Sequence, residues 1–223
     1  MPGRNAGVRV LVALAALAAV TASFGQVSIF NSSTAANNAV TKNNWLNAAG
    51  ITAGDIFQDF ESYALGTNLN GASLGGGLTI SEISTNPFMQ VQSNASFFGG
   101  SVPFGKGLAL KENRLIRFQF DAPISYFSLY SLDDSGSDVR VFLENGTFQD
   151  FNNLDVAGSG GQNAEFLGFF AAGPKIVRID YAGQGGDGEY GFDNFEYQAV
   201  PEPGLMLAGG VGLALLVKRR RQK

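Results

Sequence analysis

From residue 56 onward, short runs of alternating hydrophobic and polar residues are separated by Gly, Asn and Asp. In residues 138–144 three aliphatic side chains would share one side of an extended chain: Val139, Val141 and Leu143. A period of two is what a half-buried β-strand requires. The pattern predicts six clear strands, at residues 114–121, 125–132, 138–144, 164–170, 175–182 and 191–197.

Turn-forming residues separate these strands. Asn145-Gly146, within residues 144–147, is a strong hairpin pair, and residues 133–136 (Asp-Asp-Ser-Gly) predict another turn between neighbouring strands. Several short strands at this spacing predict an all-β fold over residues 51–199, an antiparallel β-sandwich of the jelly-roll type.

Residues 26–50 have a different pattern and predict a short helical lead-in to the sandwich. Four apolar residues fall on one helical face, interrupted by Lys42: Ala35, Ala39, Leu46 and Ala49. Gly50 is suited to end the helix, because glycine readily adopts the left-handed conformation found there. We interpret Trp45, the single tryptophan, as an anchor that packs the helix on the sandwich, with a sugar-stacking platform as the alternative.

Residues 1–25 have the three parts of a secretory signal peptide. Two arginines precede an apolar run at residues 10–20, and small residues follow up to Gly25. Cleavage after Gly25 places Ser23 and Gly25 at the two positions that the peptidase selects, and cleavage after Ala22 is the alternative. Because the apolar run is shorter than the ~20 residues of a permanent span, we predict that this segment is removed.

Residues 200–223 have a second ordered pattern. A proline-containing motif comes first and consists of Val200, Pro201, Glu202 and Pro203. An apolar stretch at residues 204–217 follows, and then a basic cluster of Lys218, Arg219, Arg220 and Arg221. The prolines keep the motif extended, and the basic cluster holds the C-terminus in the cytoplasm. At ~1.5 Å per residue the apolar stretch covers only about 21 Å, which suits a temporary transmembrane anchor.

The motif, the short apolar helix and the terminal arginines resemble the PEP-CTERM sorting signal, whose bearers are processed by a membrane protease-transpeptidase called exosortase. The resemblance covers only residues 200–223 and implies nothing about the activity of the domain before them. It implies a Gram-negative host, export by the secretion machinery and transient anchoring in the inner membrane as an exosortase substrate. The final location would then be the cell surface or the extracellular matrix.

Composition narrows the chemistry of the central domain. The 223 residues include no cysteine and no histidine, which excludes thiol nucleophiles, imidazole bases, disulfides and the usual zinc ligands. Seven of the 15 basic residues lie before residue 10 or after residue 217, so the stretch between these ends has eight basic against 19 acidic residues, a net charge of −11. This charge disfavours nucleic acid as a partner and favours cations.

Two acidic segments are candidates for a cation site, residues 58–61 (Gln-Asp-Phe-Glu) and residues 191–195 (Gly-Phe-Asp-Asn-Phe). The arrangement resembles carbohydrate-binding jelly rolls, in which the first and last strands are adjacent and an acidic residue of each binds a structural calcium. The resemblance implies Glu61 and Asp193 as calcium ligands, with Asn194 as a weaker third. Calcium suits such oxygen ligands. The alternative is that both acids are ordinary solvated residues at strand ends.

The function of the central domain is less clearly marked. A glycoside hydrolase would need two carboxylates facing a cleft, for which Asp180 and Glu189 are the nearest candidates, while Tyr126, Tyr130 and Tyr190 could present rings to a bound sugar. We predict a non-enzymatic exported surface or matrix protein with a calcium-stabilised sandwich that binds extracellular polysaccharide. A polysaccharide-active hydrolase of the same fold and a purely structural matrix protein are the alternatives.

Overall fold

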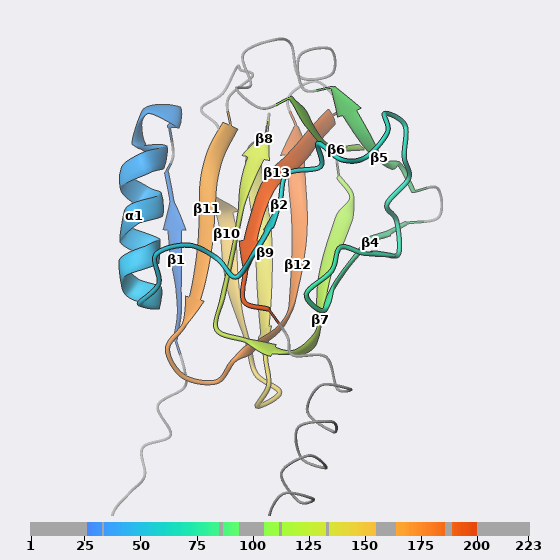
Figure 1. Cartoon of the computed structure of the whole chain (residues 1–223). Coiled ribbons are helices and arrows are strands. Elements are labelled where there is room, and N and C mark those ends of the chain that lie inside the picture. The colour runs from blue at the N-terminus through green and yellow to red at the C-terminus, as the bar shows by residue number, and fades with distance from the viewer. Residues whose placement is uncertain are drawn as a thin grey trace, which may run out of the picture.

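The computed structural model describes residues 26–32, 34–84, 87–93, 105–111, 113–132, 134–154, 164–185 and 189–199. These residues form two antiparallel β-sheets packed face to face, with a helix at one side (Figure 1). The prediction of an all-β antiparallel sandwich with a short N-terminal helix is confirmed. The signal peptide and the sorting tail lie outside the described residues.

The first sheet contains seven of the described strands. Six follow the spatial order β1 (Val27–Asn31), β11 (Ala164–Ala171), β8 (Tyr126–Leu132), β13 (Glu189–Tyr197), β6 (Lys106–Lys111) and β5 (Met89–Ser93). The seventh, β2 (Ile56–Gln58), pairs with the last part of β13. Strand β13 therefore has hydrogen-bonded neighbours on both sides, with β8 on one and β6 and β2 on the other.

The second sheet contains six of the described strands. Their spatial order is β10 (Phe148–Leu154), β9 (Asp134–Leu143), β12 (Ile176–Gly185), β7 (Leu115–Ile124), β4 (Leu78–Ile83) and β3 (Ala72–Ser73). The predicted Asn145-Gly146 hairpin joins β9 to β10, and Gly146 has the positive φ of 80° that such a turn needs. The turn predicted at residues 133–136 is wrong as a link between neighbours, because β8 and β9 belong to different sheets.

The core lies between the sheets and follows the predicted alternation. Val139, Val141 and Leu143 of β9 are at most 4% exposed. Phe118 of β7 lies at the centre, with its ring centroid 5.1 Å from that of Phe127 and 5.5 Å from that of Phe192. Each such side chain stabilises the fold by about 1.5–3 kcal/mol when fully buried, so the aromatic core is a main source of stability in a chain without cysteines.

The lead-in differs in part from its prediction. It begins as strand β1, which pairs with β11, because Val27, Ile29 and Phe30 favour an extended chain that completes the sheet edge. The short 3-10 helix η1 (Ala35–Asn37) and the helix α1 (Asn38–Ala49) follow. Gly50 ends the helix with a φ of 70°, as predicted.

Trp45 anchors the helix on the outer face of the first sheet, which confirms its interpretation as a packing residue. The indole is fully buried, and its Nε1 donates to the carbonyl of Phe169 in β11 at 3.0 Å. Gly168 lies directly beneath it, where a Cβ atom would come within 2.6 Å of the indole. The glycine therefore permits the close approach of the helix to the sheet.

A second contact between the helix and the first sheet is ionic. Lys42 of α1 forms an ion pair with Glu196 of β13, whose side chain is 6% exposed. The other carboxylate oxygen of Glu196 accepts the backbone N–H of Gly54 at 3.2 Å. The helix and the segment that follows it are thus both fixed to β13.

A side-chain amide links the two sheets at one edge. Gln149 of β10 accepts the N–H of Val27 at 2.9 Å and donates to the carbonyl of the same residue at 3.2 Å. It therefore pairs with the backbone of β1 as a neighbouring strand would. This contact fixes β10, which carries part of the site described below.

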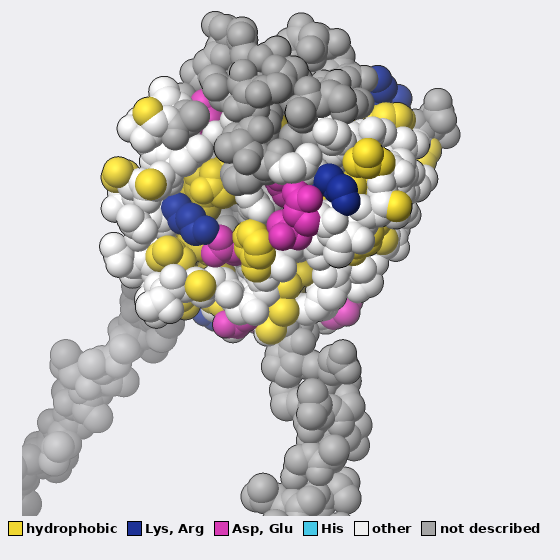
Figure 2. Space-filling view, turned by 45° about the horizontal axis from the view of Figure 1, so that its top comes forward, with side chains coloured by type: hydrophobic (Ala, Val, Ile, Leu, Met, Phe, Trp, Pro, Cys, Tyr) yellow, Lys and Arg dark blue, Asp and Glu magenta, His cyan; other side chains and the backbone are white. Residues whose placement is uncertain are grey.

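Acidic side chains are prominent on the surface, as the net charge predicts. Figure 2 shows a group of them near the middle of the face it presents, with basic side chains on either side. Small separate patches of each charge favour local ion pairs over a uniform acidic field.

Candidate functional site

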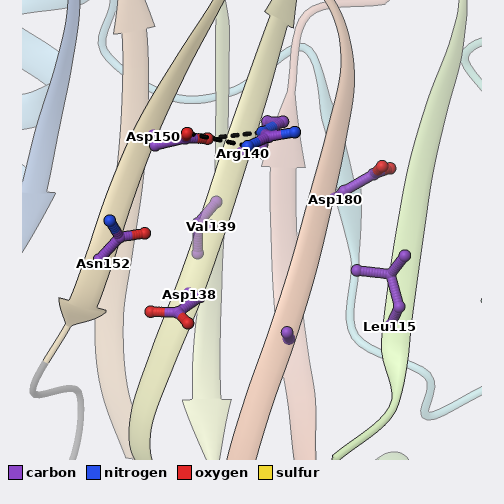
Figure 3. Close-up of a pocket in the computed structure, with 8 residues that line it drawn as sticks. Leu115, Asp138, Val139, Arg140, Asp150, Asn152 and Asp180 are labelled. Atoms are coloured by element: carbon purple, nitrogen blue, oxygen red, sulfur yellow. Dashed lines mark hydrogen bonds and ion pairs between the residues drawn. The ribbon is translucent and has the colours of Figure 1, made fainter.

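The outer face of the second sheet carries a depression of about 300 Å³. Residues of β7, β9, β10 and β12 line it, and Figure 3 shows them: Leu115, Asp138, Val139, Arg140, Asp150, Asn152, Asp180 and Ala182. Five of these eight side chains carry a carboxylate, a guanidinium or an amide. The depression therefore presents hydrogen-bonding groups to solvent.

The strand register places four of the charged residues in one row across the sheet. Arg140 of β9 is paired with Asp150 of β10 on one side and with Asp180 of β12 on the other. Asp180 is in turn paired with Arg117 of β7. Because residues directly opposite each other in antiparallel strands point to the same face, acid and base alternate along this row.

Neighbours in the row form two-point ion pairs. Arg140 Nε and Nη2 lie 2.6 and 2.9 Å from the two carboxylate oxygens of Asp150. Arg117 Nε and Nη2 lie 2.9 and 3.1 Å from those of Asp180. Arg178 adds a further contact, with its Nε 3.2 Å from Asp180 Oδ1. Two guanidinium groups thus hold Asp180, and Figure 3 shows its carboxylate directed toward β7.

The ion pairs stabilise the charged forms of their members. The hydrogen bond from Arg140 lowers the pKa of Asp150 below its ordinary value. The hydrogen bond to Asp180 raises the pKa of Arg117 in spite of partial burial. Both shifts favour ionisation, so the row keeps its alternating charges at neutral pH.

Two phenylalanines lie on one side of the charged row. The Arg178 guanidinium lies 3.5 Å from the ring centroid of Phe142, and that of Arg140 lies 4.3 Å from the ring centroid of Phe148. Phe148 is nevertheless 53% exposed. Cation–π contacts of this kind fix the orientation of the arginines and leave an aromatic edge next to the depression.

Residues on the other side of the row complete the lining of the depression. Ala182 of β12 lies opposite Asp138 of β9 and Leu115 of β7. Because alanine is much smaller than its two neighbours, the surface is hollow at this point. Asp138 and Asn152, both exposed, provide acceptor and donor groups beside it.

The arrangement is suited to hydrogen bonding with a polyhydroxyl ligand. The carboxylates and guanidinium groups of the row are planar and held by their ion-pair partners, so they can meet adjacent hydroxyl groups with little loss of side-chain entropy. It is poorly suited to general-acid catalysis, which needs a carboxyl group with a raised pKa. The pKa of Asp150 is lowered, and both oxygens of Asp180 accept from arginines.

No protein-family model and no curated protein matches the sequence. Among solved structures, the chain is similar to part of a structure that contains the CBM22-1 and GH10 modules of endo-1,4-beta-D-xylanase 10B from Clostridium thermocellum, complexed with xylohexaose. The match has 11% identity and a TM-score of 0.39, and it covers 66% of this chain but only 29% of the xylanase chain.

Two shorter proteins also match. The K2 cleaved adhesin domain of Lys-gingipain has 8% identity, a TM-score of 0.38, and coverage of 64% of this chain and 96% of that chain. A family 6 carbohydrate-binding module has 13% identity, a TM-score of 0.33, and coverage of 65% and 94%. At these scores the similarities assign neither a ligand nor an activity to this chain.

The two carboxylates considered for hydrolysis are separated by the fold. Asp180 lies in β12 of the second sheet, and Glu189 is the first residue of β13 in the first sheet. The outward direction of Asp180 follows from its pairing with Arg140 and Arg117 on the outer face. The sequence-based pairing of these two acids is therefore wrong.

The predicted calcium ligands lie on adjacent elements, but their contacts differ. Strands β2 and β13 are paired, as the resemblance implies, although the pairing stops at Gln58. Beyond it Glu61 turns toward β6, where its Oε1 accepts the backbone N–H of Lys106 at 2.8 Å. The Lys106 ammonium donates to the carbonyls of Glu61 and Tyr63, both at 2.8 Å. A cationic side chain thus contacts the same turn that would supply oxygen ligands.

Asp193 is fully buried in β13, and its Oδ1 accepts the N–H of Asn194 at 2.7 Å. Asn194 has a positive φ of 48° and lies in a β-bulge between Asp193 and Glu196. No group of three or more acidic residues that could hold a metal is present in the described part of the chain. The carboxylate and carbonyl oxygens at this position are nevertheless of the type that calcium binds. Calcium binding therefore stays a prediction.

Of the three tyrosines suggested as sugar platforms, two are buried and one is partly exposed. Tyr126 and Tyr190 are at most 5% exposed, and Tyr130 is partly buried against Phe166. Tyr190 belongs to the interior, and the other two pack near Trp45 and the helix. The exposed ring beside the depression is instead that of Phe148.

The sorting residues lie outside the described residues: Val200, Pro201, Glu202, Pro203, Lys218, Arg219, Arg220 and Arg221. In the described part of the chain, no helix has the length and apolarity to cross a bilayer. The sequence contained one partial signal for the site. The alternation of residues 138–144 places Arg140 on the outer face, but the two acids opposite it are brought there by strand registers that only the structure shows.

Proposed function

We propose that this protein is exported, processed by exosortase, and binds extracellular polysaccharide through the depression on the second sheet. Its place would be the cell surface or the extracellular matrix. The single observation that carries the binding proposal is the depression itself. Its hydrogen-bonding side chains are held in register by a row of ion pairs and border the exposed ring of Phe148.

The chemistry of that surface supports a sugar ligand. Sugar hydroxyls both donate and accept, and the depression offers acceptors at Asp138 and Asp150 and donors at Arg140 and Asn152. The apolar C–H face of a sugar ring can lie against Leu115 or the edge of Phe148. A β-sheet holds the backbone of all these residues in fixed positions, which lowers the entropy lost on binding.

The termini support the export proposal. The order of charged, apolar and small residues at 1–25 suits a signal peptide, and the pattern of residues 200–223 suits the sorting tail. Strand β13 ends at Tyr197, so the fold is complete just before the motif at Val200. A folded domain would therefore stand immediately outside the membrane while the motif remains accessible.

A glycan-binding screen of the purified protein, with and without calcium, tests the binding proposal. Replacing both Asp138 and Asn152 with Ala should weaken binding by about tenfold, since each hydrogen bond contributes about 0.5–1.5 kcal/mol. Asp121→Asn is the matched control, because Asp121 is exposed on β7 and does not line the depression. No binding to any glycan would contradict the proposal, and release of reducing ends would identify the hydrolase alternative instead.

Two variants of the tail test the processing proposal. Deleting residues 204–223 should release the domain into the medium without trimming, because the apolar stretch holds the motif at the membrane. Replacing Pro201, Glu202 and Pro203 with Ala should leave full-length protein in the membrane fraction. If the motif variant is trimmed at the normal rate, the exosortase assignment is wrong.

A further inference from the structure

The guanidinium groups around the depression are already engaged by carboxylates of this chain. Arg140 uses two nitrogens on Asp150, and Arg117 uses two nitrogens on Asp180. Arg178 contacts Asp180 with its Nε and stacks on Phe142. Two-point pairs between arginine and carboxylate are among the stronger hydrogen-bonded contacts in proteins, so a ligand anion would have to compete with them.

One carboxylate of the depression has no such cation. Asp138 accepts the backbone N–H of Asn153 at 2.9 Å, and it forms no ion pair within the described part of the chain. It is exposed and lines the depression, with Ala182 opposite it in the strand register and its carboxylate on the side of β10 (Figure 3). A ligand in the depression therefore meets a negative charge that no arginine of the described residues pairs with.

We propose, on the basis of the polysaccharide binding proposed above, that the depression selects uncharged polysaccharides over acidic ones and that Asp138 sets this selection. A sugar hydroxyl can donate to the Asp138 carboxylate, whereas a sugar carboxylate in the same place repels it. Like charges brought together at a binding surface are strongly unfavourable. The net negative charge of the rest of the domain also repels an acidic polysaccharide.

The direct test uses matched ligand pairs, because the natural ligand is not identified. The probes are a neutral β-glucan oligosaccharide, a neutral mannan oligosaccharide, and the same two chains with C6 oxidised to carboxylates. Binding to the full-length protein is measured by calorimetry at low and at high salt. We expect the oxidised form of a bound glycan to bind about tenfold more weakly at low salt. The difference should shrink at high salt, since screening shortens the range of charge repulsion.

Variants separate the role of Asp138 from the general charge. Asp138→Asn keeps the shape of the side chain and should reduce the difference between neutral and oxidised forms, while Asp121→Asn should leave it unchanged. Equal or tighter binding of the oxidised form to the wild-type protein would overturn this inference and leave the proposed function intact. So would an undiminished difference in Asp138→Asn. Absence of binding to every probe and every glycan of the screen would overturn both.

Discussion

The outer faces of the two sheets contrast sharply. Part of the outer face of the first sheet, over β1 and β11, is covered by α1, which the buried indole of Trp45 and the ion pair between Lys42 and Glu196 hold in place. The face of the second sheet carries exposed strands with alternating acids and bases and a depression. Both faces belong to antiparallel sheets, so the difference comes from the side chains they carry and from the helix that packs on the first sheet. The covered face is expected to contribute stability, and the open face is expected to contribute binding.

The largest expected effect is on the covered face. Trp45→Ala removes a fully buried indole and its hydrogen bond to Phe169, and should lower the free energy of unfolding by about 3–5 kcal/mol. Urea denaturation measures this change. Val40→Ala on the same helix is the control, because Val40 is 63% exposed and its removal should have little effect. Equal losses in the two variants would show that the helix is not anchored by its tryptophan.

The calcium prediction concerns the same face, at the junction of β2 and β13. An ion that binds only the folded chain should raise stability by about 2.7 kcal/mol at a hundredfold excess over its Kd. We therefore expect chelation to lower the melting temperature, and Glu61→Gln or Asp193→Asn to remove most of that response. Magnesium should substitute poorly, since it prefers a tighter octahedral shell.

The structure also explains how this turn could be stable without calcium. If the melting temperature is the same in EDTA and in millimolar calcium, Glu61 and Asp193 are not metal ligands. The Lys106 ammonium, which contacts the carbonyls of Glu61 and Tyr63, would then be the cation that stabilises this turn.

A smaller effect is expected for the ion pair under the helix. Lys42→Met leaves the nearly buried Glu196 carboxylate without its cation and should cost about 1–3 kcal/mol. Adding Glu196→Gln should recover part of the loss, because the uncompensated charge is then gone. A double-mutant cycle in thermal denaturation measures the coupling. Strictly additive effects would mean that the pair does not link the helix to β13.

The smallest effect is expected on the open face, where the Arg140–Asp150 pair is exposed to solvent. Because the pKa of Asp150 is lowered in the folded protein, its contribution is present above the unfolded pKa of about 3.9. It is lost as the pH falls through the lower folded value. Melting curves of wild type and Asp150→Asn at low salt should therefore differ slightly at pH 7 and converge in strong acid. A difference that grows in acid would contradict this assignment.

Strands could be predicted from the sequence where the two sides of a strand differ in polarity. The run from Asp138 to Glu144 alternates clearly because its inner side is core and its outer side is solvent. Strand β1 was missed because its three large apolar residues stand among polar neighbours at the start of an Asn- and Ala-rich segment. The C-terminal end of α1 at Gly50 was recognisable, since helix ends depend on local conformation, whereas its start at Asn38 was not.

The candidate site could not be predicted in the same way. Arg140, Asp150 and Asp180 are far apart in sequence, and they form a row only because two strand registers align them. A single sequence carries no information on register between strands that are distant along the chain. The carboxylate pair suggested for hydrolysis was wrong for a different reason, since its members lie on consecutive strands that belong to different sheets.

The position of β13 has a mechanical consequence. The chain leaves this strand at Tyr197, close to where the sorting motif begins, and the strand is hydrogen-bonded on both sides. A pull applied at that end runs along the strand, so its interstrand bonds are loaded together in shear and cannot open one after another. If the sandwich is tethered to the cell through this end, the domain should therefore resist unfolding when flowing water pulls on it.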